Sequence, residues 1–371
     1  MPTCLQSDLI AILRNFQIEG QLLEVVPYGT GHINDTYASR FQTGAGVVRY
    51  IHQRINHRVF KEPEKLMQNV ERVTRYAREK IMAAGGQPDR ETLNLIPATT
   101  GRSFFKSADG NYWRTYMFIE GARTYDQVED PRHVYSVSKA FGNFQKLLST
   151  LPGERLHETI PNFHHTRKRF EALQAAVAQD THQRAAAVGN EIEFALRREA
   201  DAAIIVTLLA QGQLPERVTH NDTKLNNVML DDQTGVGVCV IDLDTMMPGS
   251  ALYDFGDSVR IGASTAPEDE RDLSKVGVDL DMFDRLTRGY LDAARGFLTP
   301  AEIDLLAFSG RLLTFECGMR FLTDHLQGDV YFKICRPGHN LDRCRTQFRM
   351  VAEMERKMAE MEAIVNKYRH A

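Results

Sequence analysis

The first third of the chain alternates apolar and polar residues with the period of β-strands. The predicted strands are 25–28, 36–37, 47–55, 103–106 and 112–119. The last two flank Asp109-Gly110, a dipeptide typical of a tight hairpin turn. Between the third and fourth strands, apolar residues recur every three to four positions over 62–85, which predicts one amphipathic helix that ends at two glycines.

After residue 120 the apolar period becomes helical. Helices are predicted at 134–148, 191–209, 301–326 and 348–368. The exception is a β-patterned stretch at 218–243, in which two apolar runs bracket a polar segment. These patterns predict an α+β fold with a small β-sheet N-lobe that carries one long helix (1–118) and a mostly helical C-lobe (119–371).

Composition adds limits on what such a chain does. Its 371 residues are 43% hydrophobic and 25% charged, with a net charge of -4, as in an ordinary globular protein. That balance gives no bulk electrostatic reason to bind nucleic acid or a membrane. Asp8 interrupts the short N-terminal apolar stretch, and the longest apolar run, 202–210, has half the length of a membrane span. We expect a cytoplasmic protein.

The five cysteines form no CxxC pair, and the spacing of Cys335, His339 and Cys344 is a weak pattern for a metal site.

The strongest chemical pattern is THNDTKLNN, followed by an apolar strand that ends in Asp242. Phosphoryl transfer needs a base for the acceptor hydroxyl, ligands for Mg²⁺ and a cation near the moving phosphoryl group. Here Asp222 is the predicted base and Lys224 the cation, while Asn227 and Asp242 are the predicted metal ligands. Each residue alone would fit a solvated turn, but their ordered spacing between two apolar runs favours catalysis. His220 is predicted to be structural.

A second acidic motif, Asp254-Phe255-Gly256, spells the metal-binding tripeptide of protein kinases. It follows Pro248-Gly249 and opens a helical pattern, whereas Asp242 ends a buried strand as a metal ligand should. We therefore predict that Asp254 is a helix N-cap or a buttress of the catalytic loop.

These motifs resemble those of the aminoglycoside phosphotransferase and choline kinase superfamily, small-molecule kinases with the bilobal protein-kinase-like fold. Within it, YGTGHIND, THNDTKLNN, IDLDTMMPGS, YDFGDSVRIGAS and ECGMRFLTDHLQGDVYF resemble the N-acetylhexosamine 1-kinases over nearly the whole chain. The resemblance implies ATP and Mg²⁺ as cofactors, and a phosphoryl acceptor that is the anomeric C1 hydroxyl of N-acetylglucosamine or N-acetylgalactosamine. Small molecules, and neither nucleic acid nor membrane, are the expected partners.

The predicted nucleotide site begins in the N-lobe. Gly29, Thr30 and Gly31 form a turn between two strands, where glycine lets the backbone approach phosphate oxygens. The third strand lacks the lysine that protein kinases use, so Arg54 or Arg49 is the candidate replacement, or the contact is absent. Glu71 is either the acidic partner of Arg54 or a solvated helix residue. The connector at 117–120, with Met117 and Ile119, is predicted to meet adenine.

The predicted acceptor site needs fixed polar groups around sugar hydroxyls. Besides Asp222, candidates are His32, Asn34, Asp35, Thr245, Arg320, Asp324 and Tyr331. The resemblance places Arg320 and Tyr331 in the acceptor pocket and His32 and Asn34 at its roof. The spacing of Glu316, Arg320 and Asp324 also fits simple ion pairs on one helix face.

Two other functions remain open. An aminoglycoside- or choline-type kinase would use the same scaffold, but a cationic acceptor selects an acidic pocket, and Arg320 and His32 are poor neighbours for an amine. A non-catalytic nucleotide-binding pseudokinase usually lacks one of the four catalytic positions, all of which are intact here. We expect a kinase.

Overall fold

The structure is a computed structural model that describes residues 6–29, 33–127 and 130–370. Contacts divide the chain into two compact units. The first comprises Met1–Ala122, Leu151–Ile160 and Val238–Met246, and the second comprises Arg123–Thr150, Pro161–Gly237 and Met247–Ala371. The segments Leu151–Ile160 and Val238–Met246 thus return to the first unit, so no single boundary along the chain separates the two units. The boundary at residue 118 stays a prediction.

The first unit is built on a six-stranded antiparallel sheet in the order β1-β2-β3-β6-β4, with β5 paired to β6. Its strands are β1 (Gln21–Pro27), β2 (Asp35–Thr43), β3 (Gly46–Ile55), β4 (Leu95–Ile96), β5 (Phe105–Lys106) and β6 (Tyr112–Met117). The predicted hairpin at Asp109-Gly110 is confirmed: Lys106 faces Tyr112, and Gly110 takes a φ of 82°. The pattern missed β4, whose two residues are both apolar and show no alternation.

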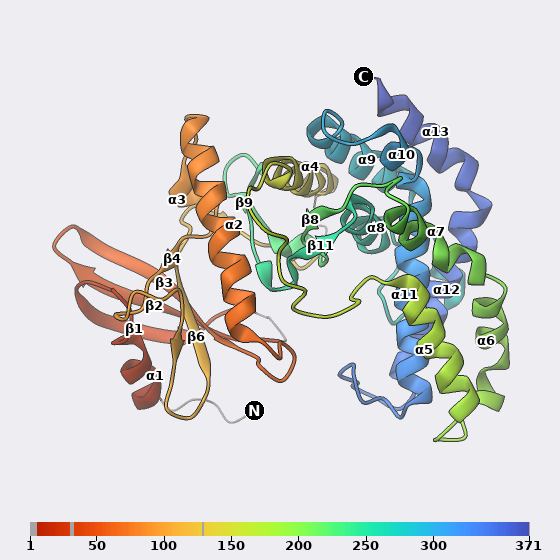
Figure 1. The fold of residues 1–371 in the computed structure, drawn as a ribbon, viewed down its shortest axis with the longest axis horizontal. Coiled ribbons are helices and arrows are strands. Elements are labelled where there is room, and N and C mark those ends of the chain that lie inside the picture. Colours follow the sequence, from red (N-terminus) through yellow and green to blue (C-terminus); the bar gives the residue numbers. More distant parts are fainter. Residues whose placement is uncertain (1–5, 30–32, 128–129, 371) are drawn as a thin grey trace. The chain divides into compact units, whose positions relative to one another are not determined.

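Helix α2 (Pro63–Ala83) runs beside the sheet (Figure 1). It is the helix predicted from the apolar period, and all five residues that set this period are buried: Leu66, Met67, Val70, Val73 and Ala77. Two shorter helices, α1 (Gln6–Leu13) and α3 (Pro88–Glu91), complete the helices described in this unit. Leu9 and Leu13 of α1 pack into an apolar cluster with Tyr37 and Trp113 of the sheet.

The middle of the sheet holds one buried histidine. His52 Nε2 lies 2.6 Å from Ser39 Oγ, and its Nδ1 lies 2.9 Å from Thr115 Oγ1. Burial lowers the pKa of His52 to about 3, because the charged ring would lose its hydration. The ring is therefore neutral in the folded protein at any pH above that value.

We expect His52 to make the first unit less stable in mild acid. Above the unfolded pKa of about 6.5 the ring is neutral in both states, but between about 6.5 and 3 only the unfolded chain takes up the proton. Stability should therefore fall as pH falls, by about 2 kcal/mol at pH 5. Urea unfolding of wild type and His52→Gln at pH 7 and 5 measures this, with exposed His57→Gln as the control. An equal loss in wild type and His52→Gln would contradict it.

The second unit is mainly helical, as expected. Its helices are α4 (Pro131–Leu148), α5 (Thr166–Gln179), α6 (Gly189–Leu196), α7 (Glu199–Ala210), α8 (Ala251–Gly262), α9 (Leu280–Ala294), α10 (Pro300–Asp304), α11 (Leu306–Leu326), α12 (His339–Arg356) and α13 (Met358–Arg369). Helix α11 packs against α5, α8 and α12 (Figure 1). Its buried residues Leu312, Phe315, Met319 and Leu322 belong to the main apolar cluster.

The structure corrects several predicted helix limits. The predicted helix at 348–368 is two helices, which meet at Lys357, where the side chain donates to the carbonyl oxygen of Val278 at 2.9 Å. The stretches 191–209 and 301–326 are likewise each divided in two, and α5 and α9 were not predicted. Among the described residues, no helix combines the length and the apolar character that crossing a membrane requires.

Candidate active site

The predicted catalytic loop lies in the second unit, between β8 (Arg217–Thr219) and β9 (Val228–Asp231). It brings three of the predicted residues together. The side chain of Asp222 is 22% exposed, and Lys224 Nζ lies 2.9 Å from its Oδ2. Asn227 Nδ2 donates to the same Oδ2 at 3.1 Å and to the backbone oxygen of Asp222 at 2.7 Å. One carboxylate is thus held from two sides while remaining accessible.

Asp254 supports this loop from α8. Its buried carboxylate accepts from the backbone N–H groups of His220 at 2.9 Å and Asn221 at 2.7 Å, and from Gln145 Nε2 at 2.5 Å. Burial raises the pKa of Asp254, although these donors oppose the shift. The N-cap of α8 is Ser250, four residues earlier. The N-cap alternative for Asp254 was therefore wrong, and the buttress alternative describes its contacts.

Asp257, one turn further along α8, supports the loop as well and was not predicted. Its Oδ2 accepts from Thr223 N at 3.0 Å, and its Oδ1 accepts from Arg260 Nε at 2.9 Å. Burial alone would raise the pKa of Asp257, but the charge of Arg260 outweighs it, so the pKa is lowered. The spacing of Asp254, Asp257 and Arg260, three apart on one helix face, was the available signal.

The predicted metal ligand Asp242 lies in the first unit. Its backbone is left-handed, with φ 57° and ψ 56°, and it precedes the 3₁₀ turn η3 (Leu243–Thr245). Asp and Asn tolerate this conformation better than most residues, and such outliers are concentrated at functional sites. Thr245, a predicted acceptor residue, is buried in the same turn.

Asp244, in the same turn, forms a buried ion pair with Arg114 of β6, and neither residue was predicted. The two side chains are 2% and 1% exposed. Arg114 Nε also donates to Gln53 Oε1 at 2.9 Å. Burial favours a neutral guanidine, but the charge of Asp244 outweighs it and raises the pKa of Arg114. Asn34 Nδ2 donates to the second oxygen of Asp244 at 2.6 Å, so this predicted acceptor residue contacts the turn.

The two candidate replacements for the missing lysine have other partners. Arg54 Nε donates to Asp35 Oδ2 at 2.7 Å, and Arg49 Nε donates to Glu120 Oε1 at 2.7 Å. Glu71 is exposed on α2 near Arg75, which agrees with its solvated alternative. The role of Arg54 in binding phosphates stays a prediction.

The remaining nucleotide residues are only partly described. Gly29 has a φ of 77°, as expected for a glycine turn, while Thr30, Gly31 and His32 lie outside the described residues. In the connector, Met117 N donates to Asn94 O at 2.9 Å, and Ile119 is buried. Adenine binding by this connector stays a prediction.

Arg320 and Tyr331 of the predicted acceptor pocket lie together in the second unit. Arg320 Cζ is 5.9 Å from the ring centre of Tyr331 and 5.3 Å from that of Phe163. Asp324 Oδ1 accepts from the backbone N–H groups of Val330 at 2.9 Å and Tyr331 at 2.7 Å, which fixes the segment that carries this tyrosine.

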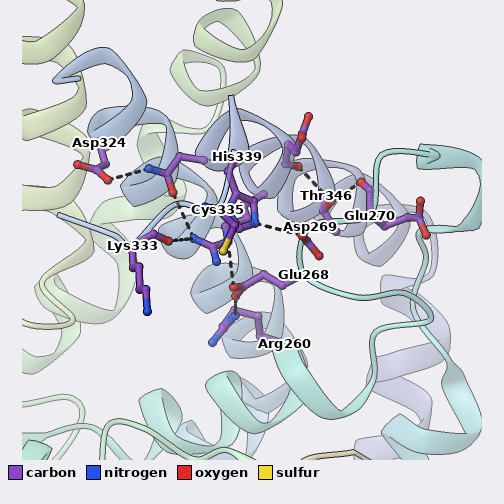
Figure 2. A network of polar contacts seen from close by, with 12 residues as sticks. Arg260, Glu268, Asp269, Glu270, Asp324, Lys333, Cys335, His339 and Thr346 are labelled. Atoms are coloured by element: carbon purple, nitrogen blue, oxygen red, sulfur yellow. Dashed lines mark hydrogen bonds and ion pairs between the residues drawn. The ribbon is translucent and has the colours of Figure 1, made fainter. Parts of the chain in front are cut away.

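Figure 2 shows a wider network of polar contacts that includes Asp324. In it, Asn340 donates to Asp324, His339 Nε2 lies 3.0 Å from Asp269 Oδ2, and Arg260 donates to Glu268. Glu316 and Asp324 are buried, and among the described residues no ion pair joins either of them to Arg320. The surface ion-pair alternative was therefore wrong.

Among the described residues, no three or more His, Cys, Asp or Glu side chains lie so that they could hold a metal ion, and Cys335, His339 and Cys344 form no such group. Asn227 donates through its amide nitrogen, and among the described residues its Oδ1 has no hydrogen-bond partner. A free amide oxygen and the carboxylate of Asp242 are hard donors that fit Mg²⁺, which keeps several waters and also binds substrate phosphates.

Comparison with known proteins places this geometry in a family. The sequence profile of the phosphotransferase enzyme family (APH) matches residues 24–287, more than two thirds of the chain. Three solved structures share its fold at low identity. Amicoumacin kinase hAmiN is 11% identical, with 95% of this chain and 94% of that chain covered and a TM-score of 0.58.

An aminoglycoside phosphotransferase from Alicyclobacillus acidocaldarius is 12% identical, with 100% and 98% of the two chains covered and a TM-score of 0.53. A choline kinase from Cryptosporidium parvum is 13% identical, with 98% and 99% covered and a TM-score of 0.54. At these identities the likeness concerns the fold alone, and the profile match carries the assignment. The chain belongs to the phosphotransferase enzyme family.

Proposed function

We propose that this protein is an ATP-dependent kinase that transfers the γ-phosphoryl group to the anomeric C1 hydroxyl of an N-acetylhexosamine. The observation that carries the proposal is the accessible carboxylate of Asp222, held by Asn227 and accompanied by Lys224. In the reaction, Asp222 orients the sugar hydroxyl and accepts its proton. Lys224 places a positive charge next to that carboxylate. There it stabilises the negative charge that shifts within the phosphoryl group during transfer.

Asn227 and Asp242 would hold Mg²⁺. When bound, the ion neutralises charge on the phosphate oxygens of ATP. The contribution of the chain is to keep these two oxygen donors in fixed local conformations. Asn227 is fixed by its two bonds to Asp222, and Asp242 by the turn that Arg114 anchors through Asp244.

A neutral sugar suits the second unit better than a cationic acceptor does. Arg169 and Arg320 lie near each other there, and burial together with the charge of Arg320 lowers the pKa of Arg169. A protonated amine of an aminoglycoside or a choline headgroup would add a third positive charge. The carboxylate of Asp324 accepts from three backbone N–H groups and from Asn340, and is therefore already engaged.

An acceptor panel tests this proposal. We expect ATP and Mg²⁺ with N-acetylglucosamine or N-acetylgalactosamine to give a sugar 1-phosphate, identified by phosphorus NMR from its coupling to the anomeric proton. Kanamycin, choline and glucose serve as parallel acceptors. Phosphate on an aminoglycoside or on choline, with none on C1 of a hexosamine, would refute the choice of acceptor. No transfer to any acceptor would favour the pseudokinase alternative.

A further inference from the structure

Glu316 and His164 form a buried pair behind the catalytic loop. The side chains of His164 and Glu316 are 6% and 1% exposed, and His164 Nδ1 lies 2.7 Å from Glu316 Oε1. The other carboxylate oxygen of Glu316 accepts from Thr166 Oγ1 at 2.6 Å. Glu316 comes from the middle of α11, and His164 lies just before α5. Arg320 and Tyr331 of the same motif are predicted acceptor residues, whereas Glu316 itself has no role so far in the proposed reaction.

The second nitrogen of the same ring reaches the catalytic loop. His164 Nε2 lies 3.2 Å from the backbone oxygen of Asn221, the residue immediately before the proposed base. Asn221 has a left-handed backbone, with φ 65°. Its N–H is held by Asp254 on one side, and its C=O is met by His164 on the other. The two peptide groups on either side of Asn221, the second of which leads into Asp222, are therefore both held.

Both hydrogen-bond partners of the His164 ring are acceptors. The ring therefore needs a proton on each nitrogen in order to donate to both. A backbone oxygen only accepts, and so does an ionised carboxylate. Burial alone would raise the pKa of Glu316, but contact with His164, the charge of Arg320 and the hydrogen bond from Thr166 together outweigh burial and lower it, which favours the carboxylate. A neutral imidazole would leave one unprotonated nitrogen facing an acceptor, and only the imidazolium donates to both.

We propose that His164, held as an imidazolium between Glu316 and the backbone oxygen of Asn221, is a positioning residue that fixes Asp222 for phosphoryl transfer. The proposal rests on the proposed function where it names Asp222 as the base. The other titratable groups that face the ring are Tyr253 and Asp257 of α8, and Asp257 adds a second negative charge. The two contacts of the ring hold the backbone that precedes Asp222, so loss of either contact loosens the loop that carries the base.

Two variants of His164 separate its two hydrogen bonds. Gln carries its amide nitrogen near the position of Nε2 and keeps the bond to Asn221, whereas Asn carries it near the position of Nδ1 and keeps the bond to Glu316. We expect His164→Asn to lose about tenfold or more in kcat, because the base is misplaced, and His164→Gln to lose less. His165→Asn is the matched control: His165 caps α5 by accepting from Lys168 N, and Asn is a good N-cap.

A split between kcat and KM distinguishes positioning from mere structural support. In Glu316→Gln the ring loses its anionic partner, so kcat should fall with little change in KM for ATP or sugar. An unchanged kcat in a folded Glu316→Gln protein would overturn the proposal. So would equal kcat values for His164→Asn, His165→Asn and wild type.

Nitrogen NMR of histidine-labelled wild-type protein gives a readout that needs no activity and no variant that might fail to fold. We expect both ring nitrogens of His164 to be protonated at pH 7. One unprotonated nitrogen would refute the imidazolium, whatever the kinetics show. If no acceptor is phosphorylated while both nitrogens are protonated, the proposed function fails and the proposed state of His164 stands. If a hexosamine is phosphorylated and one nitrogen is unprotonated, only the proposal about His164 fails.

Discussion

Asp222→Asn should reduce kcat by at least about 10²-fold, with a much smaller change in KM for ATP. An amide does not accept the proton of the sugar hydroxyl. In addition, Asn227 Nδ2 and Lys224 Nζ both approach Oδ2 of Asp222, and an amide nitrogen at that position would face two donors. Steady-state phosphorylation of the preferred acceptor, with the heat of nucleotide binding measured in parallel, separates loss of chemistry from loss of binding.

The matched control for this prediction is Asp232→Asn. Asp232 lies just after β9 in the same unit and forms an exposed ion pair with Arg123, so its neutralisation should leave kcat within about twofold of wild type. Comparable rates for Asp222→Asn and wild type would remove Asp222 from the role of base. The same loss in both variants would indicate a general effect of charge.

Arg114→Met should destabilise the first unit by about 3–5 kcal/mol, because it leaves the carboxylate of Asp244 buried without its counter-ion. Asn34 alone would remain as a side-chain donor to that carboxylate. Trp113, the single tryptophan of the chain, is buried beside Arg114 in β6, so its fluorescence reports on this unit. Urea unfolding followed by that signal measures the change.

Two further variants test the cause. Combining Arg114→Met with Asp244→Leu removes both charges and should recover most of the lost stability, since the cost comes from the unpaired ion. Arg102→Met removes an exposed ion pair with Glu64 in the same unit and should change the urea midpoint little. If Arg114→Met unfolds at the wild-type midpoint, the buried ion pair does not stabilise the unit.

The structural predictions that were confirmed depend on residues that are close to one another in the sequence. The hairpin at Asp109-Gly110 depends on two residues, and helix α2 depends on an apolar period that neighbouring residues define. The contacts of Asp222, Lys224 and Asn227 lie within six consecutive positions, so their proximity was readable, while their catalytic and metal-binding roles stay predictions. In each case the interacting groups are close in the chain, and few alternative partners compete.

The contacts that the sequence did not reveal join distant residues. Arg114 and Asp244 are 130 positions apart, and His164 and Glu316 are 152 apart. The chain has 45 basic and 49 acidic residues, so nothing local selects these pairs from the others. These pairs form because their side chains are buried together, and which side chains become buried depends on the packing of the whole folded unit. The side chain of Lys357, where α12 and α13 meet, likewise contacts a distant residue through the carbonyl oxygen of Val278.

The composition of the first unit has a consequence for protein synthesis. Arg114 leaves the ribosome long before Asp244, since the segment Val238–Met246 is made after more than a hundred intervening residues. Until then the sheet would have to enclose a guanidinium with no counter-ion, which is costly. We therefore expect the N-terminal strands to finish packing around Arg114 only after residue 246 has emerged, because a fragment ending at residue 122 lacks the carboxylate that pairs with Arg114.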